Sequence, residues 1–356
     1  MQTTAPKSLL ARKTFRWIAL VGIAGLAGQA LHAIAVPAGL FLGPMLIAIA
    51  FGVCGANLSL HRHLFKFGQG CVGLLVAHSV TWSVLTSLAQ SWHVMLFATL
   101  ITVVLSAVVG LGTVRFGGIP GSTAAWGTAP GAASAMVSMA EEYGADSRVV
   151  ATMQYVRVVC VVMIGSLVSH LLGASSFSPE VAQASAALHD TTTSNIILSL
   201  AVILFGVAAG TKIPAGALLM PLLIGGTLQL SGLLEIAMPN WLLATAYGAI
   251  GCYIGLRFDR NTVRYVIKHL PTMIIGTVIL ILLCASCAWA LALATGTEFL
   301  SMYLATSPGG LDAMAIIAVE THADVGMVLA MQTLRLFGVI LTGAYFAKQI
   351  IRLTQA

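Results

Sequence analysis

The sequence PGAASAMVSMAEEYGADSRVVATMQYVR, residues 130–157, decides the fold because the chain carries it twice. Its counterpart, PGGLDAMAIIAVETHADVGMVLAMQTLR, occupies residues 308–335, at an offset of 178, half of the 356-residue chain. Twelve of the 28 aligned positions are identical. Shared hydrophobicity could explain matched Ala and Val, but not Pro, Glu, Asp, Gln and Arg repeated at one spacing. The pattern therefore predicts two copies of one structural unit.

The composition indicates that this unit lies in a membrane. Only 8% of the residues are charged and 58% are apolar, whereas a soluble domain carries about 25% charged residues. A cytosolic enzyme and a disordered protein are therefore excluded. The 17 basic residues outnumber the 11 acidic ones. In so apolar a chain this excess indicates topology, because Lys and Arg collect in the cytoplasmic loops of membrane proteins.

Apolar segments long enough to cross a bilayer, about 20 residues each, occur in both halves. We expect membrane-spanning helices near residues 15–34, 36–56, 67–88, 92–114 and 148–172, and near 195–211, 213–234, 240–256, 270–294 and 326–347. Each half also has one apolar segment that Pro and Gly interrupt, at residues 119–140 and 299–318. The topology depends on whether these two segments cross the membrane.

The basic residues decide this question. If the interrupted segments cross, Arg148, Lys212 and the cluster at 257–268 lie outside when the N-terminus is inside, against the positive-inside rule. If they are re-entrant, each half has five crossings, the second half is inverted, and every Lys and Arg outside the helices falls inside. We therefore predict an all-α membrane protein with two inverted-topology repeats, ten transmembrane helices and two re-entrant hairpins. Both termini are then cytoplasmic, with repeat 1 at 1–175, a periplasmic linker at 176–194 and repeat 2 at 195–356.

The interrupted segments are the predicted binding site. Non-helical backbone at membrane depth survives only where it is buried in protein or lines a wet cavity. Inverted repeats with discontinuous helices are typical of secondary transporters, and the free N–H groups at a half-helix start favour anions. The alternative is that both breaks are only turns between packed helices. The predicted substrate-binding residues are Thr128, Pro130, Gly131, Ser134, Gln154, Arg157, Thr306, Ser307, Pro308, Gly309, Gly310, Asp312, Gln332 and Arg335.

Two charges need a specific explanation, because Arg157 and Arg335 lie inside apolar segments. A charge at the centre of a membrane helix costs at least about 2.5–3.5 kcal/mol. One interpretation is that the two guanidiniums bind an anionic group bidentately. The other is structural: each Arg is held by the carbonyls freed at a hairpin or by a carboxylate. The available carboxylates are Glu142, Asp146, Glu320 and Asp324, which we otherwise expect to cap the helices that follow the hairpins.

Asp312 breaks the symmetry of the repeat, because its counterpart is Ser134. It follows Gly309 by three residues, in the first turn expected for the second half-helix. Two roles stay open for it. It could cap that helix, or it could be a carboxylate that couples transport to a proton or cation.

Longer stretches of the sequence resemble a known family. GSTAAWGTAPGAASAMVSMAEEYGADSRVVATMQYVRVV (121–159) and YLATSPGGLDAMAIIAVETHADVGMVLAMQTLRLF (303–337) are similar to the duplicated motif of the AbrB family. GPMLIAIAFG (43–52) and AIGCYIGLRFD (249–259) extend the resemblance over nearly the whole chain. The resemblance implies a multi-pass protein of the bacterial inner membrane. Members of the family carry two functional labels, regulator of gene expression and ammonia monooxygenase.

The residues can be compared with both labels. A monooxygenase needs copper or iron held by His and carboxylate ligands, and the apolar segments contain no His cluster, so no metal, cofactor or enzymatic activity is expected. A direct regulator needs a nucleic-acid-binding domain, for which the longest cytoplasmic loop, 257–269, is too short. We therefore expect a secondary transporter or exporter of a small anionic organic solute, with an indirect membrane regulator as the alternative. The expected partners are the lipid bilayer, the solute and, since transporters of this size often dimerise, a second copy of the chain.

Overall fold

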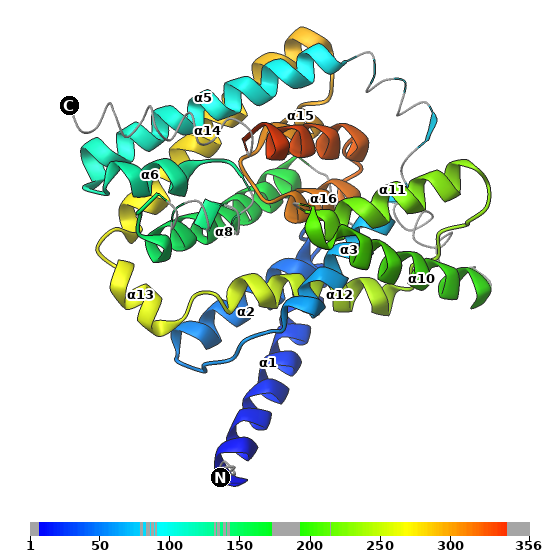
Figure 1. Cartoon of the computed structure of the whole chain (residues 1–356), viewed down its shortest axis with the longest axis horizontal. Coiled ribbons are helices and arrows are strands. Elements are labelled where there is room, and N and C mark those ends of the chain that lie inside the picture. Colours follow the sequence, from blue (N-terminus) through cyan, green and yellow to red (C-terminus); the bar gives the residue numbers. More distant parts are fainter. Residues whose placement is uncertain are drawn as a thin grey trace.

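The computed structural model describes residues 7–78, 81–82, 86, 89, 91–131, 133, 136–137, 140, 143–172, 193–213 and 215–339, without the side chains of residues 7–13, 193 and 212. The regular structure within these ranges is helical (Figure 1). Several predictions concern residues outside them. These are Ser134, Glu142, residues 176–192 of the linker predicted at 176–194, and the last part of the segment 326–347.

The helices follow one another as two similar series. In the first half they are α1 (Lys7–Ala33), α2 (Gly39–Val53), α3 (Arg62–His78), α5 (Trp92–Gly117), α6 (Gly121–Thr128) and α8 (Ser147–Leu171). In the second half they are α10 (Thr193–Ala209), the 3-10 turn η1 (Gly210–Lys212), α11 (Gly216–Leu230), α12 (Asn240–Gly255), α13 (Arg260–Val266), α14 (Leu270–Thr295), α15 (Phe299–Thr306) and α16 (Leu311–Glu320). A final helix, Val325–Val339, ends the described chain.

Four of the described helices are long and apolar enough to cross a membrane. They comprise residues Thr14–Ala33 of α1, and the whole of α5, α8 and α14. Other apolar helices are shorter, such as the 15-residue α2 and α11. By length and composition these helices are consistent with a membrane protein, while the total of ten crossings stays a prediction.

The helix boundaries are repeated at the spacing of the sequence repeat. α5 begins at Trp92 and α14 at Leu270, and both contain 26 residues. α6 begins at Gly121 and α15 at Phe299, and both contain 8 residues. Each pair of starts is 178 residues apart, so equivalent sequences form helices of equal length.

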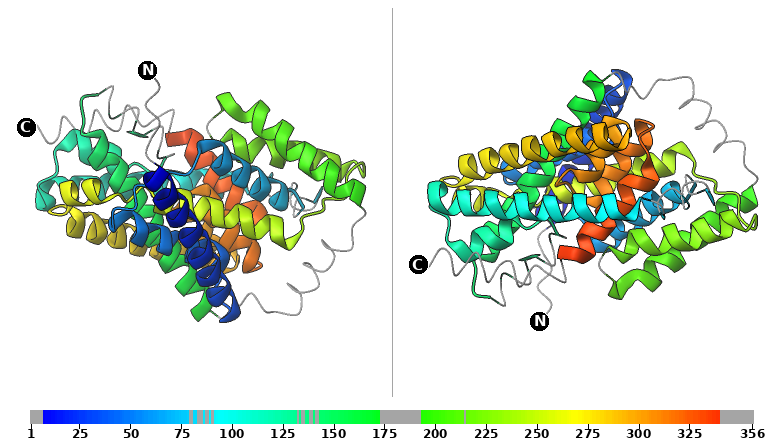
Figure 2. Two further views of the ribbon diagram at one scale, coloured as in Figure 1. Left: turned by 90° about the horizontal axis from the view of Figure 1, so that it is seen from below. Right: turned by 90° about the horizontal axis from the view of Figure 1, so that it is seen from above.

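The helices pack as two groups. We define the first bundle as α1, α2, α3, α10, α11 and α12, in which α2 packs on α12 and α3 on α11. The second bundle consists of α5, α6, α8, α14, α15, α16 and the final helix, with α14 against α5, α8 and α15. Figures 1 and 2 show α10, α11 and α12 on one side of the molecule and α5 and α14 on another. α16 contacts α3, and thereby joins the second bundle to the first.

Two equivalent glycines allow close helix contacts in the first bundle. A Cβ atom on Gly73 of α3 would collide with the backbone of Leu218 in α11. A Cβ atom on Gly251 of α12 would collide with the carbonyl oxygen of Phe41 in α2. Small residues let membrane helices approach until their backbones touch. The two crossings use equivalent glycines, so the same helix contact is made twice.

In the second bundle, the long helices α5 and α14 lie side by side and run antiparallel (Figure 2). Thr113, near the end of α5, packs on Gly276, near the start of α14. Farther along, Val109 and Leu280 share one apolar cluster. Because α5 and α14 are equivalent by sequence, their antiparallel contact brings the two halves of the chain together.

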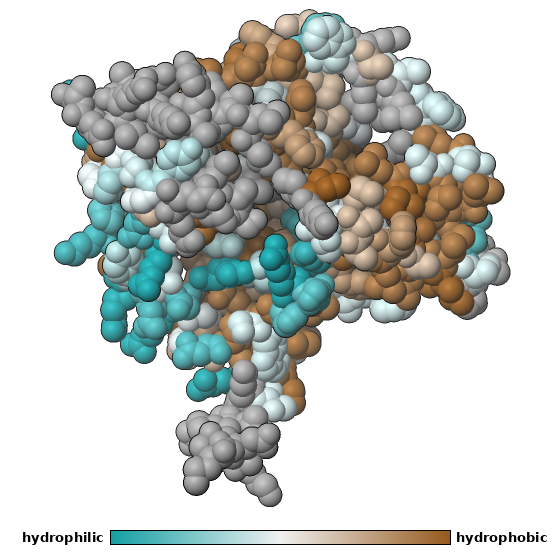
Figure 3. Space-filling view, in the orientation of Figure 1, coloured by the Kyte–Doolittle hydropathy of each residue, from teal (hydrophilic) through white to brown (hydrophobic). Residues whose placement is uncertain are grey.

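One region of the molecule carries exposed basic residues of the described loops. Arg16 donates to the Ala56 carbonyl oxygen (3.1 Å), and Tyr265 of α13 donates to Asp146 (2.8 Å), which raises the pKa of Tyr265. The Arg148 guanidinium lies over the Tyr265 ring. In Figure 3 the hydrophilic surface gathers at the lower left, around α13, while apolar surface covers α10 and α11 at the right. The exposed basic side chains of these loops thus share one region.

The glycine contacts lead to a first prediction. Gly73→Ala should lower the free energy of unfolding by about 1–3 kcal/mol, because the added methyl group forces α3 and α11 apart. Gly112→Ala on α5 is the control, since a Cβ atom there meets nothing within 4 Å. Thermal unfolding of both purified variants in detergent measures the difference. Equal stability of Gly73→Ala and Gly112→Ala would contradict the close crossing.

Candidate functional site

Each interrupted segment begins with a short helix that ends beside a proline, and we call the two segments the first and the second hairpin. α6 ends at Thr128 and is followed by Ala129 and Pro130, while α15 ends at Thr306 and is followed by Ser307 and Pro308. Ala129 (φ −57°, ψ 128°) and Ser307 (φ −55°, ψ 136°) have the extended conformation that a following proline imposes. The chain therefore leaves each helix abruptly and exposes its last carbonyl oxygens.

Those carbonyl oxygens need donors from elsewhere, because the last four C=O groups of a helix have no partner within it. In an apolar interior each unsatisfied group costs several kcal/mol. Two pairs of side chains supply the donors. We call Gln154 and Arg157 of α8 the first clamp, and Gln332 and Arg335 of the final helix the second clamp.

The first clamp closes the first hairpin. The Gln154 amide donates to the carbonyl oxygens of Trp126 (2.9 Å), Gly127 (3.1 Å) and Ala129 (3.1 Å). Arg157 Nη1 donates to Ala129 (2.8 Å) and Thr128 (3.3 Å), and its Nη2 donates to Gln154 Oε1 (2.6 Å). Gln154 is fully buried and Arg157 is 4% exposed, so the clamp is shielded from water.

The second clamp repeats this arrangement. The Gln332 amide donates to the carbonyl oxygens of Leu304 (2.9 Å) and Ser307 (3.1 Å), the equivalents of Trp126 and Ala129. Arg335 donates to the carbonyls of Ser307 and Gly309, and to Gln332 Oε1. Among the described residues no carboxylate pairs with either guanidinium. Both Arg side chains therefore make the carbonyl contacts that the structural interpretation expects, and a substrate role for them stays a prediction.

The acidic residues at the hairpin exits act mainly as caps. Asp146 accepts hydrogen bonds from the backbone N–H groups of Arg148 and Val149 at the start of α8. Asp324 accepts one from Met327 at the start of the final helix. Glu320 differs from the predicted cap, because its carboxylate accepts from the Ala38 N–H group (2.6 Å) at the start of α2, in the other bundle.

Asp312 lies in the first turn of α16, away from both clamps. The N-cap position of α16 is Gly310, and no side chain caps this helix start. Asp312 instead accepts from the amide of Gln69 on α3, at 3.1 Å from Oδ1 and 2.9 Å from Oδ2. Asp312 therefore does not form the predicted capping bond, and its predicted role in coupling stays a prediction.

The two clamps lie close to each other. Their guanidiniums are within electrostatic range of one another, and both are within range of the buried Cys284 thiol of α14. Five buried polar atoms near the hairpins have no hydrogen-bond partner among the described residues. They are Trp126 Nε1, Arg157 Nε, Tyr303 Oη, Ser307 Oγ and Arg335 Nε. Three of these atoms are N–H donors that apolar neighbours cannot satisfy, and the other two are hydroxyl oxygens, which can donate or accept.

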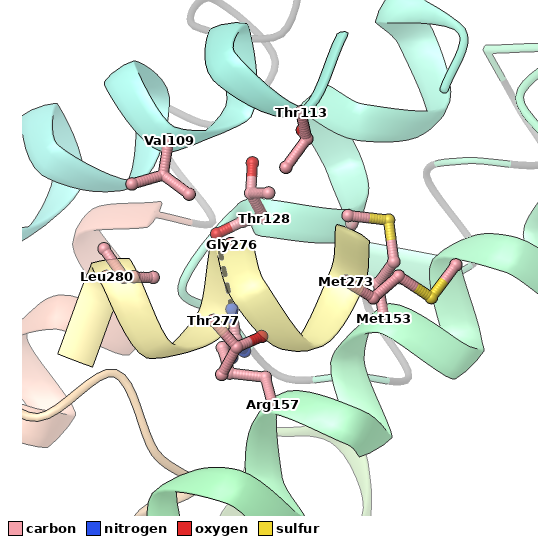
Figure 4. A pocket seen from close by; sticks show the side chains of 10 residues that line it. Val109, Thr113, Thr128, Met153, Arg157, Met273, Gly276, Thr277 and Leu280 are labelled. Carbon is pink, nitrogen blue, oxygen red and sulfur yellow. Dashed lines mark hydrogen bonds between the residues drawn. The ribbon is translucent and has the colours of Figure 1, made fainter. Parts of the chain in front are cut away.

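A pocket opens beside the first clamp, where α5, α8, α14 and the first hairpin meet. Figure 4 shows Arg157 and Thr277 next to each other in this pocket, with a dashed line for the bond from Arg157 to the Thr128 carbonyl. The lining residues are Val109, Thr113, Gly127, Thr128, Met153, Arg157, Met273, Gly276, Thr277 and Leu280. The wall is mostly apolar with one cation, and the cavity of about 10 Å³ has room for about one water molecule.

The structure thus groups most of the predicted site residues into two clusters. Thr128, Pro130, Gly131, Gln154 and Arg157 meet at the first break. Thr306, Ser307, Pro308, Gly309, Gly310, Gln332 and Arg335 meet at the second. Ser134 lies outside the described residues, and Asp312 stands apart with Gln69.

Sequence analysis missed Gln69, Trp126, Cys284 and Tyr303. Gln69 had a usable signal, since it is a single amide between two glycines in an apolar segment. Cys284 and Tyr303 had none, because a thiol and a phenol are common in apolar helices.

Comparison with known proteins places the chain among relatives of similar length. The family described as "Transition state regulatory protein AbrB" matches residues 40–351. "Putative regulator AbrB" of Escherichia coli (strain K12) is 42% identical over 89% of this chain and 91% of its own length. "Uncharacterized protein YhjN" of Bacillus subtilis (strain 168) is 27% identical over 79% of this chain and 77% of its own. No solved structure matches the chain.

The clamps lead to a second prediction. Arg335→Ala should lower the free energy of unfolding by about 1–3 kcal/mol for each carbonyl left unsatisfied, and Gln332→Leu should have a similar effect. Arg257→Ala is the control, because within the described structure this exposed Arg contacts the Tyr253 hydroxyl and the faces of two tyrosine rings alone. Thermal unfolding in detergent compares the three variants. If Arg335→Ala is as stable as Arg257→Ala, the clamp does not hold the hairpin.

Proposed function

The chain belongs to the AbrB family, and we propose that it is a secondary transporter of a small organic anion across the bacterial inner membrane. The observation that carries this proposal is the pair of hairpins, each closed by a Gln–Arg clamp. Both guanidiniums lie in the interior, near each other, and no carboxylate of the described chain neutralises them. Two buried cations without an anionic partner favour an anion from solution.

The proposed topology has ten crossings, two re-entrant hairpins and two inverted repeats. The equal lengths of α5 and α14, their antiparallel packing and the duplicated clamps support it. The basic loops around α13 would face the cytoplasm together with both termini, and the loops near Glu235 and Glu298 would face the periplasm. The two hairpins would then enter the membrane from opposite sides and meet near its centre, where inverted-repeat transporters bind substrate.

The solute would be held between the clamps, with the unpartnered donors as its ligands. Arg157 Nε and Arg335 Nε supply charge, while Tyr303 and Ser307 supply hydroxyl groups. A carboxylate has two oxygens and about four lone-pair sites, enough to accept from several of these groups. The pocket beside Arg157 would have to widen on binding, and its apolar wall would then cover the carbon skeleton of the solute.

The second candidate is a membrane sensor that affects gene expression through a partner protein. The name of the Escherichia coli relative, "Putative regulator AbrB", favours it. The surface available to a cytoplasmic partner would be the basic region that contains α13 and Arg148. Co-purification of a partner that is lost when residues 257–268 are replaced would support this role.

Transport yields a third prediction. Proteoliposomes containing the protein should accumulate one or more labelled anions from a panel of acetate, pyruvate, succinate, citrate and benzoate. Ser307→Ala and Tyr303→Phe each remove a hydroxyl that has no partner in the described structure. Losing a hydrogen bond to a charged ligand costs about 1.5–3 kcal/mol, so the apparent affinity for the solute should fall by about 10-fold or more.

Ser286→Ala is the matched control, since this exposed hydroxyl of α14 binds only the Leu282 carbonyl. The control should transport like the wild type. A protein that moves none of these anions, or variants at Ser307 and Tyr303 that match Ser286→Ala in affinity, would contradict the proposed site.

The topology has its own test, with alkaline phosphatase fused to truncated chains. A fusion after residue 235 should be active, because that loop is proposed to be periplasmic. A fusion after residue 265 should be inactive, because α13 is proposed to be cytoplasmic. The opposite pattern would overturn the inverted arrangement.

A further inference from the structure

Asp312 is a half-buried carboxylate that the anion site does not use. It lies in the first turn of α16, where this helix contacts α3 of the first bundle. Its described hydrogen-bond partner is the Gln69 side-chain amide, which reaches both carboxylate oxygens at 3.1 and 2.9 Å. The contact therefore joins the two bundles through a neutral donor.

Among the described residues no cation bonds to Asp312. The labelled helices packed against α16 are α3, α8 and α15. The final helix shares an apolar cluster with α16, and its Arg335 donates to the Ser307 and Gly309 carbonyls. The titratable groups on the three labelled helices include Lys66, Cys71 and His78 of α3, Arg157 and Cys160 of α8, and Tyr303 of α15. None of them bonds to Asp312 or acts on it electrostatically, and Arg157 donates to the first hairpin instead. On α16 itself, Glu320 binds the Ala38 N–H group.

An ionised carboxylate in such a place is unfavourable, because much of its surface is removed from water without a partner of opposite sign. The partner that Asp312 has suits both of its protonation states. A glutamine amide donates N–H to a carboxylate, and after a flip its C=O accepts from a protonated carboxyl group. An Arg or Lys partner would instead hold the group ionised.

The geometry also argues for a proton over a metal ion. Hard cations require several oxygen ligands around them, whereas the same amide N–H group lies at both oxygens of Asp312. Within the described chain no group of three His, Cys, Asp or Glu side chains is placed to hold a metal ion. A proton needs only one carboxylate oxygen and one acceptor.

The pair occurs once, although the chain is duplicated. At the offset of 178, the counterpart of Asp312 is Ser134 and that of Gln69 is Tyr247. A coupling site used once per transported solute requires one such group, while the clamps, which hold both hairpins, are present twice. Because Gln69 and Asp312 belong to different bundles, a relative movement of the bundles would separate them.

We propose that Asp312 binds the proton that drives transport and that Gln69 is its partner in one arrangement of the two bundles. This inference rests on the proposed transport function. Water on one side of the membrane gives a proton to one carboxylate oxygen, and the new O–H group donates to the Gln69 carbonyl. The proton leaves to water on the other side after the bundles move. One monovalent anion and one proton then cross together without net charge.

Infrared difference spectroscopy of the protein in nanodiscs tests proton binding without any transport. A pH step should produce the carbonyl band of a protonated carboxyl group in the wild type and remove it in Asp312→Asn. Asp324→Asn is the matched control, because Asp324 caps a helix start and Asn caps equally well. Asp312→Ser introduces the residue found at the equivalent position of the other repeat. It is a second variant without the carboxyl group, for use if Asp312→Asn does not fold. A band that persists in both Asp312 variants would overturn the proposal.

A flux assay separates this inference from the proposed function. With the transported anion of the panel, an inward proton gradient should drive accumulation by the wild type, while Asp312→Asn should lose accumulation and retain exchange of labelled for unlabelled anion. Accumulation by Asp312→Asn at the wild-type level would overturn the coupling role and leave the transporter intact. If no anion is moved by the wild type, the proposed function fails, and the infrared result still decides whether Asp312 binds a proton.

Discussion

The structure depends on satisfying the backbone carbonyl oxygens that are exposed where two helices are interrupted inside an apolar protein. Proline ends α6 and α15 abruptly, and water is not available to replace the lost helical partners. Gln154 and Arg157 supply the donors for one hairpin, and Gln332 and Arg335 for the other. The cost of burying two guanidiniums is offset by the carbonyls that they satisfy. This explains why Gln and Arg are repeated together with Pro and Gly.

The same two clamps also supply groups for the proposed anion site. Each clamp uses the terminal nitrogens of its Arg and leaves Nε without a partner in the described structure. The clamps approach each other around Cys284, so an interior otherwise built from apolar helices contains one region of positive charge. Contacts between the bundles are made elsewhere, by Gln69 with Asp312 and by Glu320 with Ala38. Both contacts place an acidic residue of α16 against a neutral donor of the first bundle.

Much of this could be predicted from the sequence. The duplication predicted equivalent helices, and the Pro-Gly pairs correctly located both breaks, because proline restricts the backbone in a known way. The carbonyl partners of Arg157 and Arg335 were one of two open alternatives, since sequence spacing does not say which acceptor a long side chain reaches. Glu320 was assigned to the helix that follows it, whereas it binds Ala38, 282 residues away. Gln69 could not be paired with Asp312, because their contact depends on how the bundles pack.

The central claim is that the two Gln–Arg clamps hold re-entrant hairpins within the bilayer and leave an anion site between them. An experimental map of the protein in nanodiscs, recorded with and without its transported anion, tests this claim most directly. We expect both hairpins at the level of the lipid chains, Arg157 and Arg335 on the hairpin carbonyls, and anion density between the guanidiniums. Hairpins outside the lipid layer, or guanidiniums paired with carboxylates of the chain, would contradict it.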